Sequence, residues 1–231
     1  MIKPESVKAL LFDVFGTCVD WRGSIIKEGP ERHKRVPKGF DWAAFADAWR
    51  GMYQPAMEKV RAGDRPFVNL DRLHRESLDA LARQFKFEHL VEADMADLNR
   101  AWHRLDPWPD TVAGLTRLKA RYTIAPLSNG NVALLNNMAK RAGLPWDLIL
   151  STELTRKYKP QPEAYLGAVA LLGIGPGEAM MVAAHNGDLA AAAACGLRTA
   201  FVPRPTEDTE ATADWDIVAT DFLDLATQCG A

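Results

Sequence analysis

Cysteine is scarce in this sequence, with three residues, Cys18, Cys195 and Cys229, among 231. They are too few and too far apart for a disulfide framework, and no two of them form a CxxC pair. We therefore expect three reduced side chains that act as small hydrophobic residues. Because Cys18 follows soon after Asp13, a reactive thiol is an alternative there, but a buried side chain is the expectation.

A surplus of positive charge is also lacking, and so are long apolar runs. The 28 Lys and Arg residues are balanced by 30 Asp and Glu residues, which gives a formal net charge of -2. We therefore expect neither nucleic acid nor an anionic membrane as a partner. No apolar run approaches the length of a membrane span, and Met1 to Glu5 lead into the first strand-like segment without an apolar signal region. The expected location is the cytoplasm.

What the sequence does contain is an alternation of short β-prone runs and helical segments. Helical periodicity covers residues 111–120, 131–142, 164–172 and 189–194, with Gly143 as a C-terminal cap of the second segment. The β-prone runs are residues 7–12, 122–127, 148–151, 179–184, 199–202 and 216–219. Alternation with short connections predicts an α/β core, a Rossmann-like, doubly wound parallel sheet with helices on both faces.

Residues 21–106 interrupt this alternation, because they show helical periodicity and no convincing strand. We expect an inserted helical domain there, and a core domain made of residues 1–20 and 107–231. One apolar helix face should pack in the insertion rather than contact substrate, and a second helix should span residues 70–85. The first helix should kink or end at Pro55, and residues 23–39 should form a mobile connection. The residues of the apolar face are Trp42, Phe45, Trp49, Met52 and Tyr53.

Polar side chains follow four of the predicted strands. Any one of them alone is more often a helix cap, a turn former or a solvated lysine. Together they mark the edge where the carboxyl ends of parallel strands meet and where such sheets bind ligands. The sequence therefore predicts an active site made from Asp13 with Thr17, from Ser128, Asn129 and Gly130, from Lys159, and from Asp188.

In these motifs the chain resembles the haloacid dehalogenase (HAD) superfamily and, within it, the type II L-2-haloacid dehalogenases. The resemblance covers nearly the whole chain and implies the HAD fold with an inserted helical cap domain. Arg50, after Trp49, resembles the cap arginine of the family. The matching segments, in order, are Phe12 to Thr17, Leu127 to Gly130, Tyr158 to Pro160 with Pro162 and Tyr165, and Asp188.

Phe15 separates the dehalogenase branch from the phosphatases that resemble this chain. Those phosphatases have an aspartate two residues after the nucleophile to protonate a leaving alcohol, whereas a halide leaves as a weakly basic anion and needs no proton. Their fourth motif also carries a second aspartate at the position of Ala192. Losing a carboxylate that helps to hold a divalent cation argues against magnesium. We expect no metal and no cofactor, with Lys159 supplying the positive charge.

The resemblance implies hydrolysis of short 2-haloalkanoic acids, such as haloacetate and L-2-halopropionate, to 2-hydroxy acids. Asp13 would attack the carbon that bears the halogen, invert it, release the halide and form an ester that water then cleaves. Lys159 would keep Asp13 ionised. The substrate is then a small haloacid and the first product a halide ion.

The resemblance also implies roles for the other motif residues. Arg50 and Asn129 would hold the departing halide through N–H groups. Asp188 would orient or deprotonate the hydrolytic water, or anchor Lys159. Tyr165 matches the motif tyrosine, although it could instead be a half-buried helix aromatic. The substrate carboxylate would be held by Thr17, Ser128 and the backbone N–H groups that follow Asp13, at Val14 and Phe15.

The fourth motif departs from that of the better-known type II enzymes, where Ser, Asn and Trp stand at the positions of Ala183, His185 and Gly187. The imidazole of His185 could hydrogen-bond water, halide or carboxylate, or it could satisfy backbone groups at the strand end. We count His185 and its neighbour Asn186 among the candidate substrate- and halide-binding residues. A changed halogen or chain-length preference is the expected consequence.

Two other readings stay open from the sequence. The chain could be another HAD hydrolase, a phosphatase or phosphonatase that acts on a small phosphorylated substrate, or a non-catalytic binding protein on the same fold. Activity without magnesium would exclude the first, and the presence of nucleophile, lysine and acid together argues against the second. Apolar helices in the insertion and the family resemblance favour a homodimer.

Overall fold

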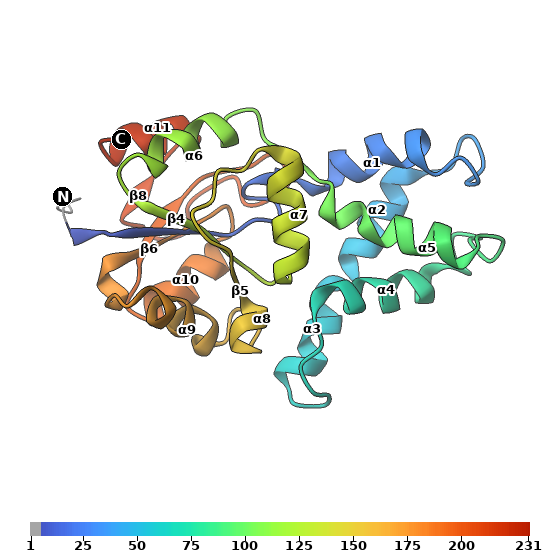
Figure 1. Cartoon of the computed structure of the whole chain (residues 1–231), viewed down its shortest axis with the longest axis horizontal. Helices are drawn as coiled ribbons and strands as arrows, with labels where there is room; N and C mark the ends of the chain where they lie inside the picture. Colours follow the sequence, from blue (N-terminus) through green and yellow to red (C-terminus); the bar gives the residue numbers. More distant parts are fainter. Residues whose placement is uncertain (1–5) are drawn as a thin grey trace.

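The computed structural model describes residues 6–231, so the expectation for Met1 to Glu5 lies outside the described residues. Figure 1 shows a sheet flanked by helices on one side of the molecule and a group of helices on the other. This second group consists of α1 to α5, which we call the inserted helices. In the part of the chain that the structure describes, no helix is both long and apolar enough to cross a membrane.

The central sheet has six strands in the order β5-β4-β1-β6-β7-β8, and all neighbouring strands are parallel. The six predicted strands and the doubly wound α/β class are therefore confirmed. Phe12, the last residue of β1, pairs with Pro126 of β4 on one side and Val182 of β6 on the other. The strands are β1 (Ala9–Phe12), β4 (Thr123–Ser128), β5 (Leu150–Ser151), β6 (Ala179–Ala183), β7 (Arg198–Phe201) and β8 (Ile217–Val218).

The strand order reverses around β1, and this reversal places the site. From β1 the chain moves outward to β4 and β5, and it then returns to form β6 on the other side of β1. The loops that leave the carboxyl ends of β1, β4 and β6 therefore diverge and leave a crevice between them. Asp13 begins the loop after β1, at the centre of that crevice.

Helices cover both faces of the sheet because successive strand residues point to opposite sides. Leu10 and Phe12 of β1 belong to a hydrophobic cluster with residues of α6, α7 and α11, whereas Leu11 belongs to a second cluster with residues of α9 and α10. Figure 1 shows α6 and α11 on one side of the sheet and α9 and α10 on the other. The helices are α6 (Thr111–Lys119), α7 (Val132–Ala142), α8 (Thr152–Thr155), α9 (Pro162–Leu172), α10 (Asn186–Ala194) and α11 (Phe222–Gln228).

The inserted helices contain the predicted apolar face. Trp42, Phe45 and Trp49 are buried among one another and their neighbours, as expected for packing residues. The first helix breaks at Met52, before Pro55, so Pro55 lies in the first turn of the next helix, where its missing N–H costs no hydrogen bond. The elements are α1 (Trp21–Arg32), α2 (Trp42–Gly51), α3 (Tyr53–Arg61), α4 (Leu70–Leu81), α5 (Glu92–Asn99) and η2 (Arg100–His103).

Two predictions for this part were wrong. Residues 23–39 are not mainly a connection, because most of them continue α1, which Asp20 caps by accepting a hydrogen bond from the backbone N–H of Gly23. Only a few positions of α1 are apolar, so the sequence shows no clear helical periodicity there. Its charged residues bind other elements, as Lys27 binds Asp106. The expectation of no strand in residues 21–106 was also wrong. Asp106 begins a short strand, β3 (Asp106–Pro107), which pairs antiparallel with β2 (Val19–Asp20) where the inserted helices leave the core.

The remaining local predictions concern a glycine and the cysteines. Gly143 follows α7 in the left-handed conformation at φ 70°, so the predicted C-terminal cap is confirmed. All three cysteines are free. Cys18 is fully buried, its thiol donates to the backbone oxygen of Asp13, and burial raises the pKa of that thiol well above its ordinary value. The structure therefore supports the buried hydrophobe at Cys18 rather than the reactive thiol.

Candidate active site

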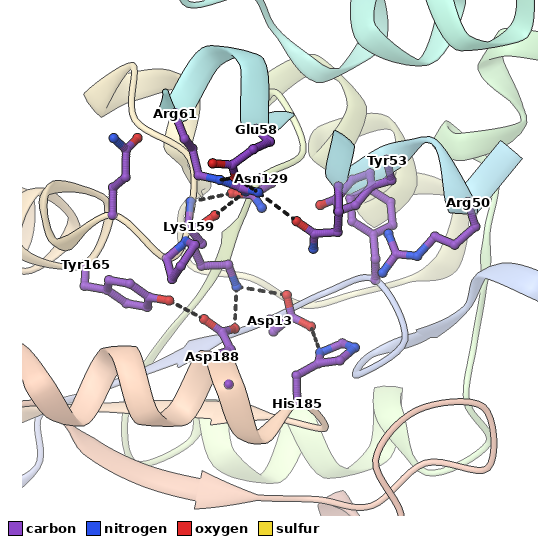
Figure 2. Close-up of a pocket in the computed structure, with 15 residues that line it drawn as sticks. Asp13, Arg50, Tyr53, Glu58, Arg61, Asn129, Lys159, Tyr165, His185 and Asp188 are labelled. Atoms are coloured by element: carbon purple, nitrogen blue, oxygen red, sulfur yellow. Dashed lines mark hydrogen bonds and ion pairs between the residues drawn. The ribbon is translucent and has the colours of Figure 1, made fainter. Parts of the chain in front are cut away.

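A cavity of about 650 Å³ opens between the carboxyl edge of the sheet and helices α2 and α3. Figure 2 shows side chains from both parts pointing into it. The sheet side contributes residues from the loops after β1, β4 and β6, from the loop between α8 and α9, and from α9 and α10. The inserted helices contribute residues from the last turn of α2 and from α3. Its lining is Asp13, Phe15, Arg50, Tyr53, Gln54, Glu58, Arg61, Asn129, Lys159, Pro160, Gln161, Tyr165, His185, Gly187 and Asp188.

Asp13 lies at the floor of this cavity with a side chain that is only 10% exposed. Its Oδ1 accepts a hydrogen bond from Lys159 Nζ at 2.9 Å, and its Oδ2 accepts one from Thr17 Oγ1 at 2.8 Å. His185 Nδ1 lies 3.0 Å from the same Oδ2. Burial would raise the pKa of Asp13, but Lys159 and His185 outweigh it and hold this pKa below its ordinary value. Asp13 is therefore an ionised, poorly hydrated carboxylate.

Lys159 lies between two carboxylates. Its Nζ donates to Asp188 Oδ2 at 2.6 Å as well as to Asp13, and the side chain is 8% exposed. Burial lowers the pKa of Lys159, but the charges of Asp13 and Asp188 raise it above its ordinary value. The backbone N–H of Lys159 donates to Oδ1 of Asn129 at 2.9 Å. This bond occupies the amide oxygen of Asn129, so the amide nitrogen is left as a donor at the cavity wall.

Asp188 is fixed from two sides. It lies in the first turn of α10, and its Oδ1 accepts a hydrogen bond from the hydroxyl of Tyr165 on α9 at 2.6 Å. Tyr165 is fully buried apart from its contact with the cavity, and burial together with Asp188 raises its pKa above the ordinary value. The reading of Tyr165 as a half-buried helix aromatic therefore does not fit, because the residue is a buried donor to Asp188. Asp188 holds Lys159 and Tyr165 and does not touch Asp13.

His185 bridges Asp13 to Glu207, a residue that no sequence motif marks. Its Nε2 lies 2.8 Å from Oε2 of Glu207, which belongs to the loop between β7 and β8. Burial opposes a charge on His185, but the hydrogen bonds and charges of Asp13 and Glu207 raise its pKa to about 10. The ring is therefore an imidazolium at neutral pH and donates from both nitrogens. The alternative in which His185 satisfies backbone groups is not what the structure shows.

Arg50 enters the cavity from the last turn of α2. Its guanidinium carbon lies 4.2 Å from the ring centroid of Tyr53 and 5.4 Å from that of Trp21. Within residues 6–231, its buried Nη1 has no hydrogen-bond partner. A buried guanidinium N–H between aromatic rings is an unsatisfied donor that an anion would satisfy. The rings of Phe15 and Tyr53 form the apolar wall beside it, at 6.3 Å between centroids.

The side chains of three predicted residues, Thr17, Ser128 and Asn186, do not line the cavity as expected. Thr17 is buried, and its hydroxyl is used by Asp13 and by the backbone N–H of Ala184 at 2.9 Å, so it cannot also hold a substrate carboxylate. Ser128 is buried beneath the cavity, where its hydroxyl accepts from the backbone N–H of Gly130. The side chain of Val14 is also buried, but the expectation for Val14 concerned its backbone N–H, which stays a prediction.

Asn186 points away from the cavity, which corrects its selection as a substrate-binding residue. Its amide nitrogen donates to Asp208 and to the backbone oxygen of Glu210, and its amide oxygen accepts from the N–H groups of Thr212 and Trp215. All four hydrogen bonds go to the loop that carries Glu207. Asn186 therefore orders this loop and has no capacity left for substrate.

Residues that sequence reasoning missed come from two sources. Gln54, Glu58 and Arg61 line the cavity at i, i+4 and i+7 spacing on α3, a pattern that marks one polar helix face. Tyr53, which is predicted to pack within the insertion, also lines the cavity. Glu207 stands in a loop without periodicity, so no local signal could have identified it. Within the described residues, no group of three or more His, Cys, Asp or Glu side chains is arranged to hold a metal ion.

Comparisons with known proteins agree on one family. The sequence model of the haloacid dehalogenase-like hydrolases matches residues 7–196. The (S)-2-haloacid dehalogenase 4A of Burkholderia cepacia is 29% identical over 204 residues, 87% of this chain and 84% of the relative. The crystal structure of the defluorinating L-2-haloacid dehalogenase Rha0230 is 51% identical, with a TM-score of 0.93 over 97% of this chain and 96% of that one.

A third similar protein has a ligand attached to it. It is the L-2-haloacid dehalogenase from Xanthobacter autotrophicus, whose structure was solved with chloropropionic acid covalently bound. The two chains are 25% identical, and they superimpose with a TM-score of 0.80 over 97% of this chain and 99% of the relative. The similarity therefore extends over both the sheet and the inserted helices.

Proposed function

Because the chain belongs to the haloacid dehalogenase-like hydrolase family, as its motifs predicted, we propose that it hydrolyses the carbon–halogen bond of short 2-haloalkanoic acids to give 2-hydroxy acids. Its α/β core has the HAD fold. The observation that carries the proposal is the position of Asp13, an ionised and buried carboxylate that faces the unsatisfied guanidinium N–H of Arg50 across one cavity. A nucleophile and an anion site are the two groups that halide displacement needs.

In the first step, an oxygen of Asp13 attacks the carbon that bears the halogen. The new C–O bond forms as the C–X bond breaks, the halide leaves with the bonding electron pair, and no proton moves. Burial of Asp13 favours this step because a poorly hydrated carboxylate is a better nucleophile when it is held in line. Arg50 and the amide nitrogen of Asn129 donate to the halide as its charge develops. Phe15 carries no acid group, and none is needed.

In the second step, water attacks the carbonyl carbon of the Asp13 ester, and His185 accepts its proton. In the free enzyme His185 is protonated, because the negative charges of Asp13 and Glu207 raise its pKa. Formation of the ester removes the charge of Asp13, so the pKa of His185 falls and the ring releases its proton to solvent. The neutral imidazole then takes one proton from water as the water oxygen adds to the carbonyl carbon. The bond between this carbon and the product oxygen breaks, and the second proton of the water passes to that oxygen. The Asp13 carboxylate, the alcohol product and protonated His185 result.

Lys159 and Asp188 support both steps. Lys159 keeps Asp13 ionised for the attack and stabilises the oxyanion that forms when water adds to the ester. Asp188 and Tyr165 fix the position of the lysine. Since the hydroxyl of Thr17 is used by Asp13 and Ala184 and Ser128 is buried outside the cavity lining, the substrate carboxylate is left to the backbone N–H groups after Asp13. Gly187 lines the cavity at the position of the family's tryptophan. Because it has no side chain and no atom lies within 4 Å of where a Cβ would be, the cavity is wider at this point.

We also propose that residues 21–106 act as a cap domain that closes over the core formed by residues 1–20 and 107–231. The lining of the cavity supports this division, since α2 and α3 supply its upper wall. The family resemblance supports a homodimer. Three free cysteines suit a reducing compartment, and this supports the cytoplasm as the place of action.

A single-turnover experiment tests the proposed function. Excess protein is mixed with L-2-chloropropionate in water enriched in oxygen-18, and both chloride release and the label in the Asp13 peptide are measured. Chloride release with label in Asp13 is the expected result, because water attacks the ester carbonyl. Label that enters lactate directly, with none in Asp13, would contradict the ester route. A phosphatase assay with a small phosphorylated substrate is run beside it. Phosphate release that requires magnesium in that assay, without chloride release from L-2-chloropropionate, would favour a phosphatase instead.

A further inference from the structure

Trp21 links the two halves of the site, although it does not line the cavity. It is the first residue of α1 and is 6% exposed. Its indole N–H donates to Oε1 of Glu207 at 2.7 Å, across 186 positions of sequence. The other oxygen of Glu207 lies 2.8 Å from Nε2 of His185. Both oxygens of this carboxylate are therefore used, one by the inserted helices and one by the imidazole.

The same indole ring contacts the anion side of the site. The guanidinium carbon of Arg50 lies 5.4 Å from its centroid, and the ring of Trp102 stacks against it at 6.2 Å with an interplanar angle of 24°. A guanidinium over an aromatic face is attracted by the ring quadrupole. Trp21 thus holds Arg50 through its ring face and Glu207 through its N–H.

The side chain of Glu207 lies in a narrow space, and Gly16 lies directly against its carboxylate. A Cβ at Gly16 would collide with the carboxylate of Glu207, and Gly16 has a φ of +87°, which disfavours other residues. Glu207 itself lies in a loop outside the helices and strands, where its side chain has several rotatable bonds. A hydrogen bond from Trp21 restricts that freedom and satisfies an oxygen that burial would otherwise leave unpaired.

We propose that Trp21 is a positioning residue for the hydrolytic step, because its indole N–H aims Glu207 at His185. This inference rests on the proposed function, in which His185 activates water. In the ester intermediate the charge of Asp13 is gone, so Glu207 becomes the remaining carboxylate partner of the imidazole. The orientation of the Glu207 carboxylate then determines both the orientation of the His185 ring and the affinity of this ring for the proton of water.

The test is Trp21→Phe, which keeps an aromatic ring and removes the N–H. Pre-steady-state halide release should stay within about twofold of wild type, whereas hydrolysis of the ester should slow about tenfold, so that esterified Asp13 accumulates and is seen by mass spectrometry. The acid limb of the pH–kcat profile should shift to lower pH, because a misplaced Glu207 no longer raises the pKa of His185. Glu207→Gln should show the same shift, and the double variant should be no slower than Glu207→Gln alone.

Trp108→Phe is the matched control. Its indole N–H also donates beside the nucleophile loop, to the backbone oxygen of Gly16 at 2.8 Å, but it does not touch Glu207. This variant should leave the acid limb in place. Where Trp21→Phe folds poorly in thermal unfolding, benzothienylalanine at position 21 replaces the N–H by sulfur in a ring of the same shape and should give the same kinetic result.

Three results would overturn the inference. These are unchanged ester hydrolysis in the variant without the N–H, an acid limb that does not move, and equal losses in halide release and hydrolysis. A different result would overturn the proposed function instead. If the wild-type protein releases no halide from chloroacetate, bromoacetate, fluoroacetate or L-2-chloropropionate, the proposed reaction itself is wrong, whatever Trp21 does.

Discussion

Nζ of Lys159 lies 2.9 Å from Oδ1 of Asp13, and the two side chains are 8% and 10% exposed to solvent. A buried pair of this kind is held by its charges and hydrogen bonds, because removing one partner leaves an uncompensated charge in a poorly hydrated place. Here the pair is part of a larger network, since Asp188 also binds Lys159 and His185 also binds Asp13. Asp13 therefore receives positive charge from two sides.

Lys159→Met should nearly abolish halide release at neutral pH. Without the ammonium group, burial raises the pKa of Asp13, and the fraction of ionised nucleophile falls. We expect single-turnover halide release to slow by about 100-fold or more, with the residual rate rising as pH increases. Lys157→Met is the control, because Lys157 is partly exposed and lies 3.8 Å from Glu163 on the surface. A normal burst of halide from Lys159→Met would contradict the role given to the lysine.

Protonated His185 should stabilise the protein in a definite pH window. Its pKa is raised from 6.5 to about 10 in the folded protein. Because the folded state binds the proton more tightly, this stabilisation is fully present below pH 6.5 and is lost as pH rises towards 10. Urea unfolding at several pH values should show the free-energy difference between wild type and His185→Asn shrinking across that window. A difference that stays constant, or grows, between pH 6.5 and 10 would exclude the imidazolium.

Much of the fold and part of the site followed from local sequence. Each strand of the core is a short apolar run, and parallel strands bring their carboxyl ends to one edge, so Asp13, Asn129, Lys159 and Asp188 could be placed together before the structure was known. The structure confirms that they line one cavity. Their chemical roles remain predictions.

The rest depended on contacts that local sequence does not encode. Glu207 reaches His185 from an irregular loop, and only the tertiary fold brings the two together. The hydroxyl of Thr17 was expected to bind substrate, but it donates to Asp13 and accepts a hydrogen bond from the backbone N–H of Ala184, just after the neighbouring strand β6. Helix α1 was missed because its glycines and Pro30 weaken helix propensity, whereas packing of Ile25 and the cap at Asp20 compensate.

Arg61→Met should impair catalysis through the position of Lys159. Nη1 of Arg61, on α3, donates to the backbone oxygen of Lys159 at 3.0 Å, which connects an inserted helix to the loop that carries Lys159. Loss of this bond should lower kcat about three- to tenfold and raise KM for chloroacetate, because one hydrogen bond contributes about 1 kcal/mol. Arg65→Met is the control, since Arg65 binds Glu76 within the inserted helices. Equal kinetics in the two variants would contradict the coupling.

His74→Phe should make the protein more stable. His74 is 2% exposed and stacks on Trp102 at 4.4 Å, and within residues 6–231 neither ring nitrogen has a hydrogen-bond partner. An unsatisfied buried polar group costs about 1–3 kcal/mol, so a phenyl ring of similar shape should raise the free energy of unfolding by about 1 kcal/mol. His74→Ala, the control, should lower it by about 3 kcal/mol, because it leaves a cavity among aromatic rings.

The advantage of His74→Phe should grow as the solution becomes more acidic. Burial is the main reason that the pKa of His74 falls to about 3, with Arg50 adding to the effect and Asp71 opposing it. His74 therefore takes up a proton near pH 6.5 in the unfolded chain but only near pH 3 in the folded protein. The free energy of unfolding of the wild type falls as the pH is lowered between these two values. Phenylalanine has no such proton, so urea unfolding at pH 7 and pH 5 should show a larger gain at pH 5. A loss of stability in His74→Phe at both pH values would contradict this prediction. It would mean that the imidazole nitrogens have a hydrogen-bond partner in solution, and that the ring stabilises the position of the neighbouring Arg50.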